Sequence, residues 1–239
     1  MTRPAVDAIA RPRYSICTVD TPIAPIRIIV VEDYPVVLEG LVQWLSHEPL
    51  IKVLGEAGTL TEARDLVDRD PPEILLMDLM VNGADGIGFI REMRERHPDV
   101  RILVLSMHDE MVYSERVVRA GASGFVMKQQ STRDLLTAIE TVHRGELYLN
   151  PRVAGTMLRK MLQPTRGEIR VGLESLTDRE LHVYQLIGSG LSTRLIAEAL
   201  KLSVKTIDAH RENIKNKLGI NSAADLARQA ATWITSQRT

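Results

Sequence analysis

Short apolar runs alternate with amphipathic stretches of helical length through the first part of the chain. The apolar runs have the length of strands and occupy residues 26–31, 51–56, 74–77, 100–105 and 124–127. The amphipathic stretches occupy residues 35–47, 59–70, 86–97, 110–120 and 131–144. Such alternation is typical of parallel strands joined by helices that cover both faces of a sheet. We therefore predict an α/β doubly wound five-stranded parallel sheet of the flavodoxin-like type.

The pattern changes after Arg144, and the rest of the chain indicates helices only. One helix is expected at residues 151–162, followed by a stretch with Pro164, Gly167 and Gly172 that suits a linker. Four more helices are expected at residues 177–189, 193–200, 204–218 and 222–234. We therefore predict a flexible leader, an α/β domain, a helical linker and an all-α domain, with the boundaries 1–25, 26–145, 146–172 and 173–239.

Three of the expected helices begin with the spacing of a capping box. In this motif a Ser or Thr side chain bonds the backbone three residues later, and an acidic side chain there bonds back. The three pairs are Thr59 with Glu62, Ser131 with Asp134, and Thr177 with Glu180.

Charge is divided unevenly along the chain, although the formal net charge is only −1. Residues 26–150 contain 13 Lys and Arg against 21 Asp and Glu, a balance of −8. Residues 151–172 carry +4 and residues 173–239 carry +2. The basic C-terminal part is therefore the candidate for binding a polyanion.

The composition argues against several classes of protein. The single cysteine, Cys17, rules out an internal disulfide and a zinc site built on cysteines. No apolar run approaches the roughly 20 residues of a membrane helix, and the N-terminus lacks the apolar core of a secretory signal. We expect a cytoplasmic protein without a membrane partner.

Ionisable and polar side chains follow four of the five expected strands. They are Glu32 and Asp33 after the first strand, Asp78 after the third, Ser106 after the fourth and Lys128 after the fifth. The carboxyl ends of parallel strands form one rim of the sheet, where ligands bind. Carboxylates brought together there repel one another, and a hard divalent cation relieves the repulsion. Magnesium suits such a site because it binds one or two carboxylates, waters and phosphate oxygens.

Four motifs in the same order make residues 26–145 resemble a response-regulator receiver domain. The matching strings are VVED, ILLMDL with DG seven residues after the Asp, ILVLS and GFVMK. The resemblance implies that Asp78 accepts a phosphoryl group from the phosphohistidine of a sensor histidine kinase. It also implies a Mg²⁺ site formed by Asp33, Asp78 and the Met80 main-chain carbonyl, with Glu32 acting through water.

The resemblance assigns further roles around the same rim. Ser106 and Lys128 sense the phosphoryl group, and Phe125 stands where the family usually has an aromatic that changes rotamer. The chain also departs from the family: Val81 and Asn82 follow Met80, where the family usually has Met-Pro. Loss of that proline is expected to relax the loop without removing a ligand.

Residues 176–221 resemble a LuxR-type helix-turn-helix, and with the receiver they indicate a response regulator of the NarL/FixJ type. The matching strings are LTDREL, GLSTRLIAEAL and LSVKTIDAHRENIKNKLGI. In a helix-turn-helix the second helix, here residues 204–218, enters the major groove. The expected DNA-binding residues on it are Lys205, Thr206, Asp208, Ala209, Arg211, Glu212, Asn213, Lys215 and Asn216.

The last expected helix carries a stripe of small and apolar residues, with two open interpretations. The family uses the equivalent helix for dimerisation, which would involve Ala223, Leu226, Ala227 and Ala230. Packing within one subunit explains the same stripe equally well.

The resulting prediction is a phosphorylation-controlled, DNA-binding transcriptional regulator that forms a homodimer when phosphorylated. It is not an enzyme beyond phosphorylating and dephosphorylating itself. We expect the unphosphorylated protein to mask its recognition helix or hold it at the wrong spacing, with the acidic receiver docked on the basic C-terminal part.

Two other functions differ from this prediction in what they require of the sequence. A hydrolase of the haloacid-dehalogenase type needs a second acid two residues after Asp78, where Met80 stands. A receiver-fold interaction module with weak or lost DNA binding stays open, because Asp208 and Glu212 occupy positions where basic residues are commoner.

Overall fold

The computed structural model describes residues 24–84, 86–107, 110–162, 172–200 and 202–236. Most of the predicted leader, the aspartate of the DG pair and residues 163–171 of the predicted linker lie outside these ranges. Within them, no helix is both long enough and apolar enough to cross a membrane.

A five-stranded parallel sheet forms the first domain and confirms the predicted fold class. Its strands run in the order β2-β1-β3-β4-β5. Their bounds are β1 (Ile26–Val31), β2 (Ile51–Ala57), β3 (Ile74–Asp78), β4 (Arg101–Ser106) and β5 (Gly124–Met127), each within one residue of the prediction. The strand order changes direction between β1 and β3: β2 is added on one side of β1, and β3 to β5 are added on the other. The carboxyl ends of β1 and β3 therefore flank the crevice where such sheets bind ligands.

Five helices cover the sheet, and the pleat divides its side chains between two apolar layers. One layer packs against α1 (Pro35–Ser46) and α5 (Thr132–His143), and includes Leu45 and Ile139. The other packs against α2 (Leu60–Arg69), α3 (Gly86–Arg96) and α4 (Glu110–Ala120). Successive residues of β3 alternate between the layers, which is the two-residue period of a strand buried on both faces.

Two of the three predicted capping boxes are present in full. The hydroxyls of Ser131 and Thr177 accept from backbone amides at the third helical residue, whose carboxylates bond back. At α2 the Thr59 hydroxyl accepts from Glu62, but the Glu62 carboxylate accepts from Gly58 rather than from Thr59. The caps fix where these helices begin and therefore how the preceding loops leave the sheet.

The described elements after β5 and α5 are all helices, as predicted. Helix α6 (Pro151–Leu162) packs on α4, and a short 3-10 helix, Gly172–Ser175, precedes the C-terminal domain. That domain contains α7 (Asp178–Gly188), α8 (Thr193–Ala199), α9 (Val204–Leu218) and α10 (Ala223–Ser236). Ile207 and Ile214 of α9 are fully buried against the neighbouring helices, whereas Val204 is 47% exposed.

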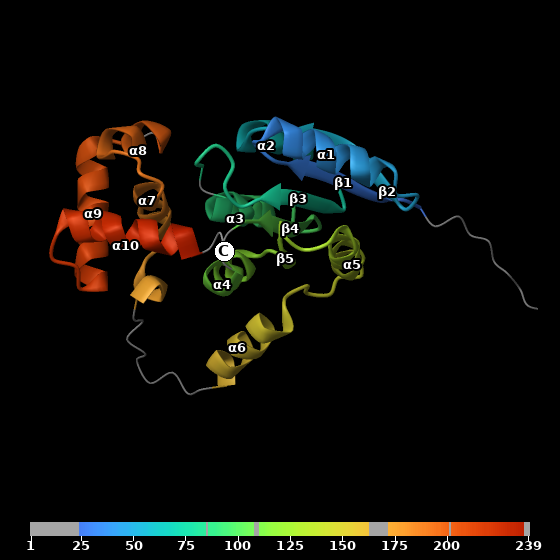
Figure 1. Ribbon diagram of the computed structural model, residues 1–239. Helices are drawn as coiled ribbons and strands as arrows, with labels where there is room; N and C mark the ends of the chain where they lie inside the picture. The colour runs from blue at the N-terminus through green and yellow to red at the C-terminus, as the bar shows by residue number, and fades with distance from the viewer. Residues whose placement is uncertain (1–23, 85, 108–109, 163–171, 201, 237–239) are drawn as a thin grey trace, which may run out of the picture.

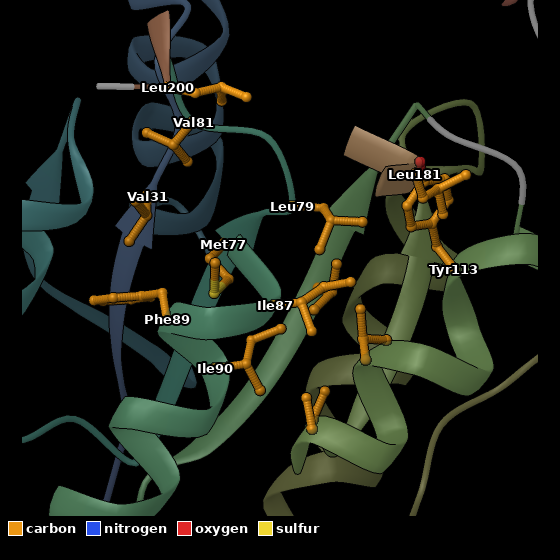
Figure 2. Packing of buried hydrophobic residues seen from close by; sticks show 14 of the residues in the cluster. Val31, Met77, Leu79, Val81, Ile87, Phe89, Ile90, Tyr113, Leu181 and Leu200 are labelled. Atoms are coloured by element: carbon orange, nitrogen blue, oxygen red, sulfur yellow. The ribbon is translucent and has the colours of Figure 1, made fainter. Parts of the chain in front are cut away.

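One apolar cluster continues from the receiver-like domain into the C-terminal domain. It includes Ile87 and Tyr113 of α3 and α4 together with Leu181 and Ile187 of α7. Figure 2 shows Leu181 close to Tyr113 within this cluster. In Figure 1, α7 and the end of α10 lie on the side facing the sheet domain, and α9 lies on the far side. The two domains are therefore docked through α7 and α10.

Candidate functional site

The predicted side chains at the strand ends meet around one ammonium group. Lys128 follows β5, and its Nζ donates to Asp78 Oδ2 at 2.8 Å and to Glu32 Oε2 at 2.5 Å. The Lys128 amide also donates to the Ser106 carbonyl at 2.8 Å, which fixes the loop after β5 to the end of β4. Glu32 and Asp78 are 1% and 7% exposed, so this is a buried cluster of charges.

Burial and charge act in opposite directions on this cluster. Burial, together with the nearby Asp78 carboxylate, raises the pKa of Glu32, although Lys128 works against the rise. Burial disfavours the charged form of Lys128, yet the carboxylates of Asp78 and Glu32 outweigh it and raise the pKa of the ammonium. Lys128 is therefore held charged because two buried carboxylates need a cation.

Asp33 completes a group of three carboxylates able to hold a metal ion. Oxygen atoms of Glu32, Asp33 and Asp78 lie within 4.8 Å of one another. The Asp33 Oδ1 atom is buried and has no hydrogen-bond partner among the described residues. Three carboxylates and one ammonium leave two uncompensated negative charges when all are ionised. The residues present therefore fit a hard divalent cation with oxygen ligands, such as Mg²⁺.

The remaining predicted receiver residues lie in or shortly after β3, β4 and β5. The Met80 amide donates to Asp78 Oδ1 at 3.2 Å, so the chain turns directly around the carboxylate after β3. Ser106, at the end of β4, is fully buried. Phe125 of β5 is also fully buried and belongs to the larger apolar layer.

The loop after Asp78 is tied down although it lacks proline. The Asn82 amide donates to Asp33 Oδ2 and the Asn82 side chain donates to the Gly58 carbonyl, each at 2.7 Å. Val81 is fully buried beneath the same loop. The expectation of a relaxed loop is therefore corrected, because asparagine supplies two hydrogen bonds in place of the proline ring.

The C-terminal domain forms part of the cleft that contains the acidic cluster. The cleft has a volume of about 750 Å³. Asp33, Asp78 and Lys128 line one side, and residues of α7 and α10 line another. The latter include Gln185, Leu186 and Ile234, and no sequence motif marks these residues as part of this site.

An ionic clamp joins the two domains beside this cleft. Asp178, the first residue of α7, accepts from Arg91 of α3 and from Arg116 of α4, the latter at 2.9 Å. Arg116 also donates to the Leu173 carbonyl at 3.0 Å. Burial raises the pKa of Asp178, but the two guanidinium groups outweigh burial and the net pKa is lowered.

The polarity of this clamp is the reverse of the one expected from net charge. The receiver-like domain supplies the cations and the basic C-terminal part supplies the anion. Net charge does not identify the contact because a few directly paired groups dominate over distant, screened charges. No sequence pattern marks Arg91 or Arg116, since both look like ordinary helix-surface arginines.

The docked receiver-like domain does not mask the recognition helix α9. The expectation of a masked helix is therefore corrected, and wrong spacing of two such helices remains as the other alternative. The residues of α9 predicted to bind DNA are all at least partly accessible. Lys205, Asp208, Ala209, Glu212, Asn213 and Asn216 are exposed, and Thr206, Arg211 and Lys215 are intermediate. Glu212 pairs with Lys215 at 2.8 Å, so one acid on this face neutralises one of its bases.

The last helix serves mainly the core of its own subunit. Leu226 and Ala230 of α10 are fully buried against the rest of the C-terminal domain. Of the two open interpretations, packing within one subunit therefore accounts for these two residues in this conformation. Ala223 is exposed and Ala227 is partly exposed, so these two positions alone of the predicted four face outward.

Comparison with known proteins gives two matches that divide the chain as the fold does. Residues 28–140 match the response regulator receiver domain, and residues 174–230 match the bacterial regulatory proteins of the luxR family. The transcriptional regulatory protein DegU of Brevibacillus brevis is 32% identical, covering 82% of this chain and 89% of its own. The oxygen regulatory protein NreC of Staphylococcus carnosus is also 32% identical, covering 85% and 96%.

The fold is similar to that of solved structures over most of the chain. RcsB from Salmonella enterica serovar Typhimurium, solved bound to the rprA promoter with a phosphomimetic, superposes with a TM-score of 0.64. The alignment covers 87% of this chain and 98% of that one, at 24% identity.

Replacement of Lys128 by methionine is expected to destabilise the receiver-like domain near neutral pH. Removing one partner leaves buried charges uncompensated, which costs about 3 kcal/mol in the free energy of unfolding. With the ammonium gone, the already raised pKa of Glu32 rises further, so the cost grows with pH and shrinks as pH falls to about 5. Urea unfolding at both pH values measures the effect.

Lys52→Met is the matched control, because Lys52 is an exposed lysine of β2 outside the cluster. The loss in Lys128→Met should also shrink when Mg²⁺ is added, since the cation replaces the missing positive charge. Equal stability of the Lys128 and Lys52 variants near neutral pH would show that the ammonium does not hold the carboxylates.

Proposed function

Because the chain belongs to the NarL/FixJ-type response regulators, which join a receiver to a LuxR-type DNA-binding domain, we propose that phosphorylation of Asp78 controls its action on promoter DNA. The family consists of transcription regulators rather than metabolic enzymes. The observation that carries the proposal is the ion-paired cluster of Glu32, Asp78 and Lys128 in a cleft shared by both domains.

The chemistry proposed for Asp78 is transfer of a phosphoryl group from a phosphohistidine. A carboxylate oxygen of Asp78 forms a bond to phosphorus as the phosphorus–nitrogen bond breaks, and the electron pair returns to the imidazole. A bound Mg²⁺ ion supplies charge neutralisation to the phosphoryl oxygens, with Asp33, Asp78 and the Met80 carbonyl as ligands and Glu32 acting through water. The sensor kinase that supplies the phosphohistidine is a proposed partner.

Lys128 must change partners in this reaction. Its ammonium contacts Asp78 Oδ2 at 2.8 Å, and the Asp78 carboxylate loses its negative charge when it becomes an acyl phosphate. We assign its new partner as a phosphoryl oxygen, which carries more charge than the modified carboxylate. Ser106, buried at the end of β4, donates its hydroxyl proton to another phosphoryl oxygen. Repacking of the β4–α4 region, with Phe125 in the adjoining core, follows from these new contacts.

The signal reaches the C-terminal domain through the docked interface. A phosphoryl group on Asp78 enters a cleft whose opposite wall is Gln185, Leu186 and Ile234. The α4 helix that follows Ser106 carries Arg116, one of the two arginines that hold Asp178. Movement of α4 therefore loosens the clamp, and the two domains separate. Phosphorylation and docking are coupled because both use the same helix.

Control of DNA binding is proposed to act through the spacing of two recognition helices. The α9 face is accessible while the domains are docked, so unmasking it is not the controlling step. In the docked arrangement Ile234 of α10 lines the same cleft as Asp78. Release frees α10, with Ala223 and Ala227 facing outward, for a homodimer that places two α9 helices about one DNA turn apart.

A second candidate function rests on the charge of α9. Asp208 and Glu212 are exposed on the proposed DNA-binding face, and Glu212 pairs with Lys215. Such a face repels phosphate groups, which favours a receiver-fold interaction module with weak DNA binding. In either case we propose that the protein acts in the cytoplasm, where it meets its kinase and DNA.

Replacement of Asp78 by asparagine is expected to abolish uptake of label from radiolabelled acetyl phosphate in the presence of Mg²⁺. The amide is not a nucleophile toward phosphorus, so no acyl phosphate forms. Asp99→Asn, at an exposed loop aspartate, should take up label as the unmodified protein does. Labelling of the Asp78 variant at the wild-type level would refute the assignment.

Replacement of Asp178 by asparagine is expected to undock the domains without phosphorylation. The uncharged amide leaves Arg91 and Arg116 without their carboxylate, so the radius of gyration from small-angle X-ray scattering should increase. Asp225→Asn is the matched control, because Asp225 also lies in the first turn of a helix but its carboxylate accepts from Arg228 and Ser222 of its own domain. An unchanged scattering curve for the Asp178 variant would mean that the clamp does not hold the domains together.

Replacement of Glu212 by glutamine is expected to tighten DNA binding. The change removes a charge that faces the phosphates and releases Lys215 to contact them, which should add about one unit to the slope of log affinity against log salt. Fluorescence anisotropy of the beryllofluoride-treated protein on DNA selected from a random pool measures this, with Glu140→Gln in α5 as control. Failure of the unmodified and Glu212 proteins to select any sequence would favour the interaction module.

A further inference from the structure

The loop between β3 and α3 has an unusual backbone at Asn82. Its φ angle is 51°, which makes it the one non-glycine residue with positive φ among the residues that the structure describes. Gly83 follows with a φ of 68°, and Val81 before it is fully buried. Asparagine tolerates this left-handed region better than other residues with a side chain, so the sequence suits the turn.

Asn82 joins three loops at the rim of the sheet. Its amide donates to Asp33 Oδ2 in the loop after β1, and its side-chain Nδ2 donates to the Gly58 carbonyl after β2, each at 2.7 Å. A residue in the left-handed region thus makes both contacts. Asn82, in the loop after β3, therefore holds Asp33, which lies in the loop after β1.

The two oxygens of the Asp33 carboxylate therefore differ: one accepts a hydrogen bond and the other does not. Asp33 Oδ2 is fixed by Asn82, whereas Oδ1 is buried without a hydrogen-bond partner, in the group formed with Glu32 and Asp78. Holding a buried oxygen unpartnered is unfavourable unless another group binds it. The tether prevents Asp33 from rotating to satisfy both oxygens with other donors or with water.

We propose that Asn82 is a positioning residue that presets Asp33 for a divalent cation. The inference rests on the proposed function, since it takes Mg²⁺ as the ion held by Glu32, Asp33 and Asp78. Proline at this position has no amide hydrogen and fixes φ near −65°, so it cannot make this contact. Asn82 thus favours cation binding through its backbone hydrogen bond to Asp33, which a proline could not make.

The test is Mg²⁺ binding by the unphosphorylated full-length protein, measured by isothermal titration calorimetry. Asn82→Pro, which removes the amide and the left-handed turn, should weaken Mg²⁺ binding by about tenfold or more. Asn82→Gly keeps the amide and tolerates positive φ, so it should stay within about threefold of the unmodified protein. This rescue by glycine separates orientation of Asp33 from a general need for the side chain.

Two further proteins make each outcome decisive. Asp33→Asn should lose most Mg²⁺ binding, because it removes a ligand. Absence of Mg²⁺ binding by the unmodified protein would overturn both the proposed site and this inference. If Asn82→Pro does not fold by circular dichroism, Asn82→Ala replaces it, because alanine disfavours positive φ and should bind about threefold more weakly than the glycine variant.

Equal affinity of the unmodified protein and Asn82→Pro would overturn the positioning role while leaving the metal site intact. A glycine variant as weak as the proline variant would also overturn it, because the amide would then not be the group that matters.

Discussion

The ion pairs of Lys128 with Glu32 and Asp78 are the interaction on which the rest of the structure depends. They place one ammonium between two carboxylates that are nearly inaccessible to water, at the carboxyl ends of three different strands. Buried ions of this kind are stable only while they are paired. Any reaction that changes the charge of Asp78 must therefore change the hydrogen-bond partners of Lys128. In this way a covalent change at Asp78 leads to a change in conformation.

The second constraint is that the C-terminal domain forms part of the cleft that contains Asp78. The α7 and α10 helices approach the cluster closely enough that Gln185 and Ile234 line the same cleft as Asp78. The clamp on Asp178 lies beside it, on helices α3 and α4. A short path of packed elements thus links Asp78 to the C-terminal domain, and α9 remains outside that path with its outer face accessible. The proposed coupling between the domains therefore runs through docking, not through occlusion of the outer face of α9.

The sequence was sufficient for the fold and for the residues at the strand ends, because both follow local rules. Strand and helix periods placed every element of the sheet domain within one or two residues, and the order of the strand ends brought Asp33, Asp78, Ser106 and Lys128 to one rim. Fully buried strands are strong signals since their apolar runs have few alternative interpretations.

Contacts between segments distant in sequence could not be predicted in the same way. The clamp joins Arg91, Arg116 and Asp178, whose local patterns suit any exposed helix, and its polarity opposes the net charges of the two domains. The tether from Asn82 to Asp33 was also missed, although the Asn-Gly pair is a turn signal, because a turn signal does not identify the acceptor. The small-residue stripe of α10 left two interpretations open, and burial of Leu226 and Ala230 assigns half of it to the core.

The central claim is that phosphorylation of Asp78 separates the two docked domains. The most direct measurement is the distance between spin labels on α5 and on the loop before α10, introduced by Arg133→Cys and Asn221→Cys with Cys17→Ser. Double electron–electron resonance should give one narrow distance distribution in the unphosphorylated protein. Acetyl phosphate with Mg²⁺ should shift it to longer and broader distances. An unchanged distribution in protein shown by mass to carry the phosphoryl group would contradict the account.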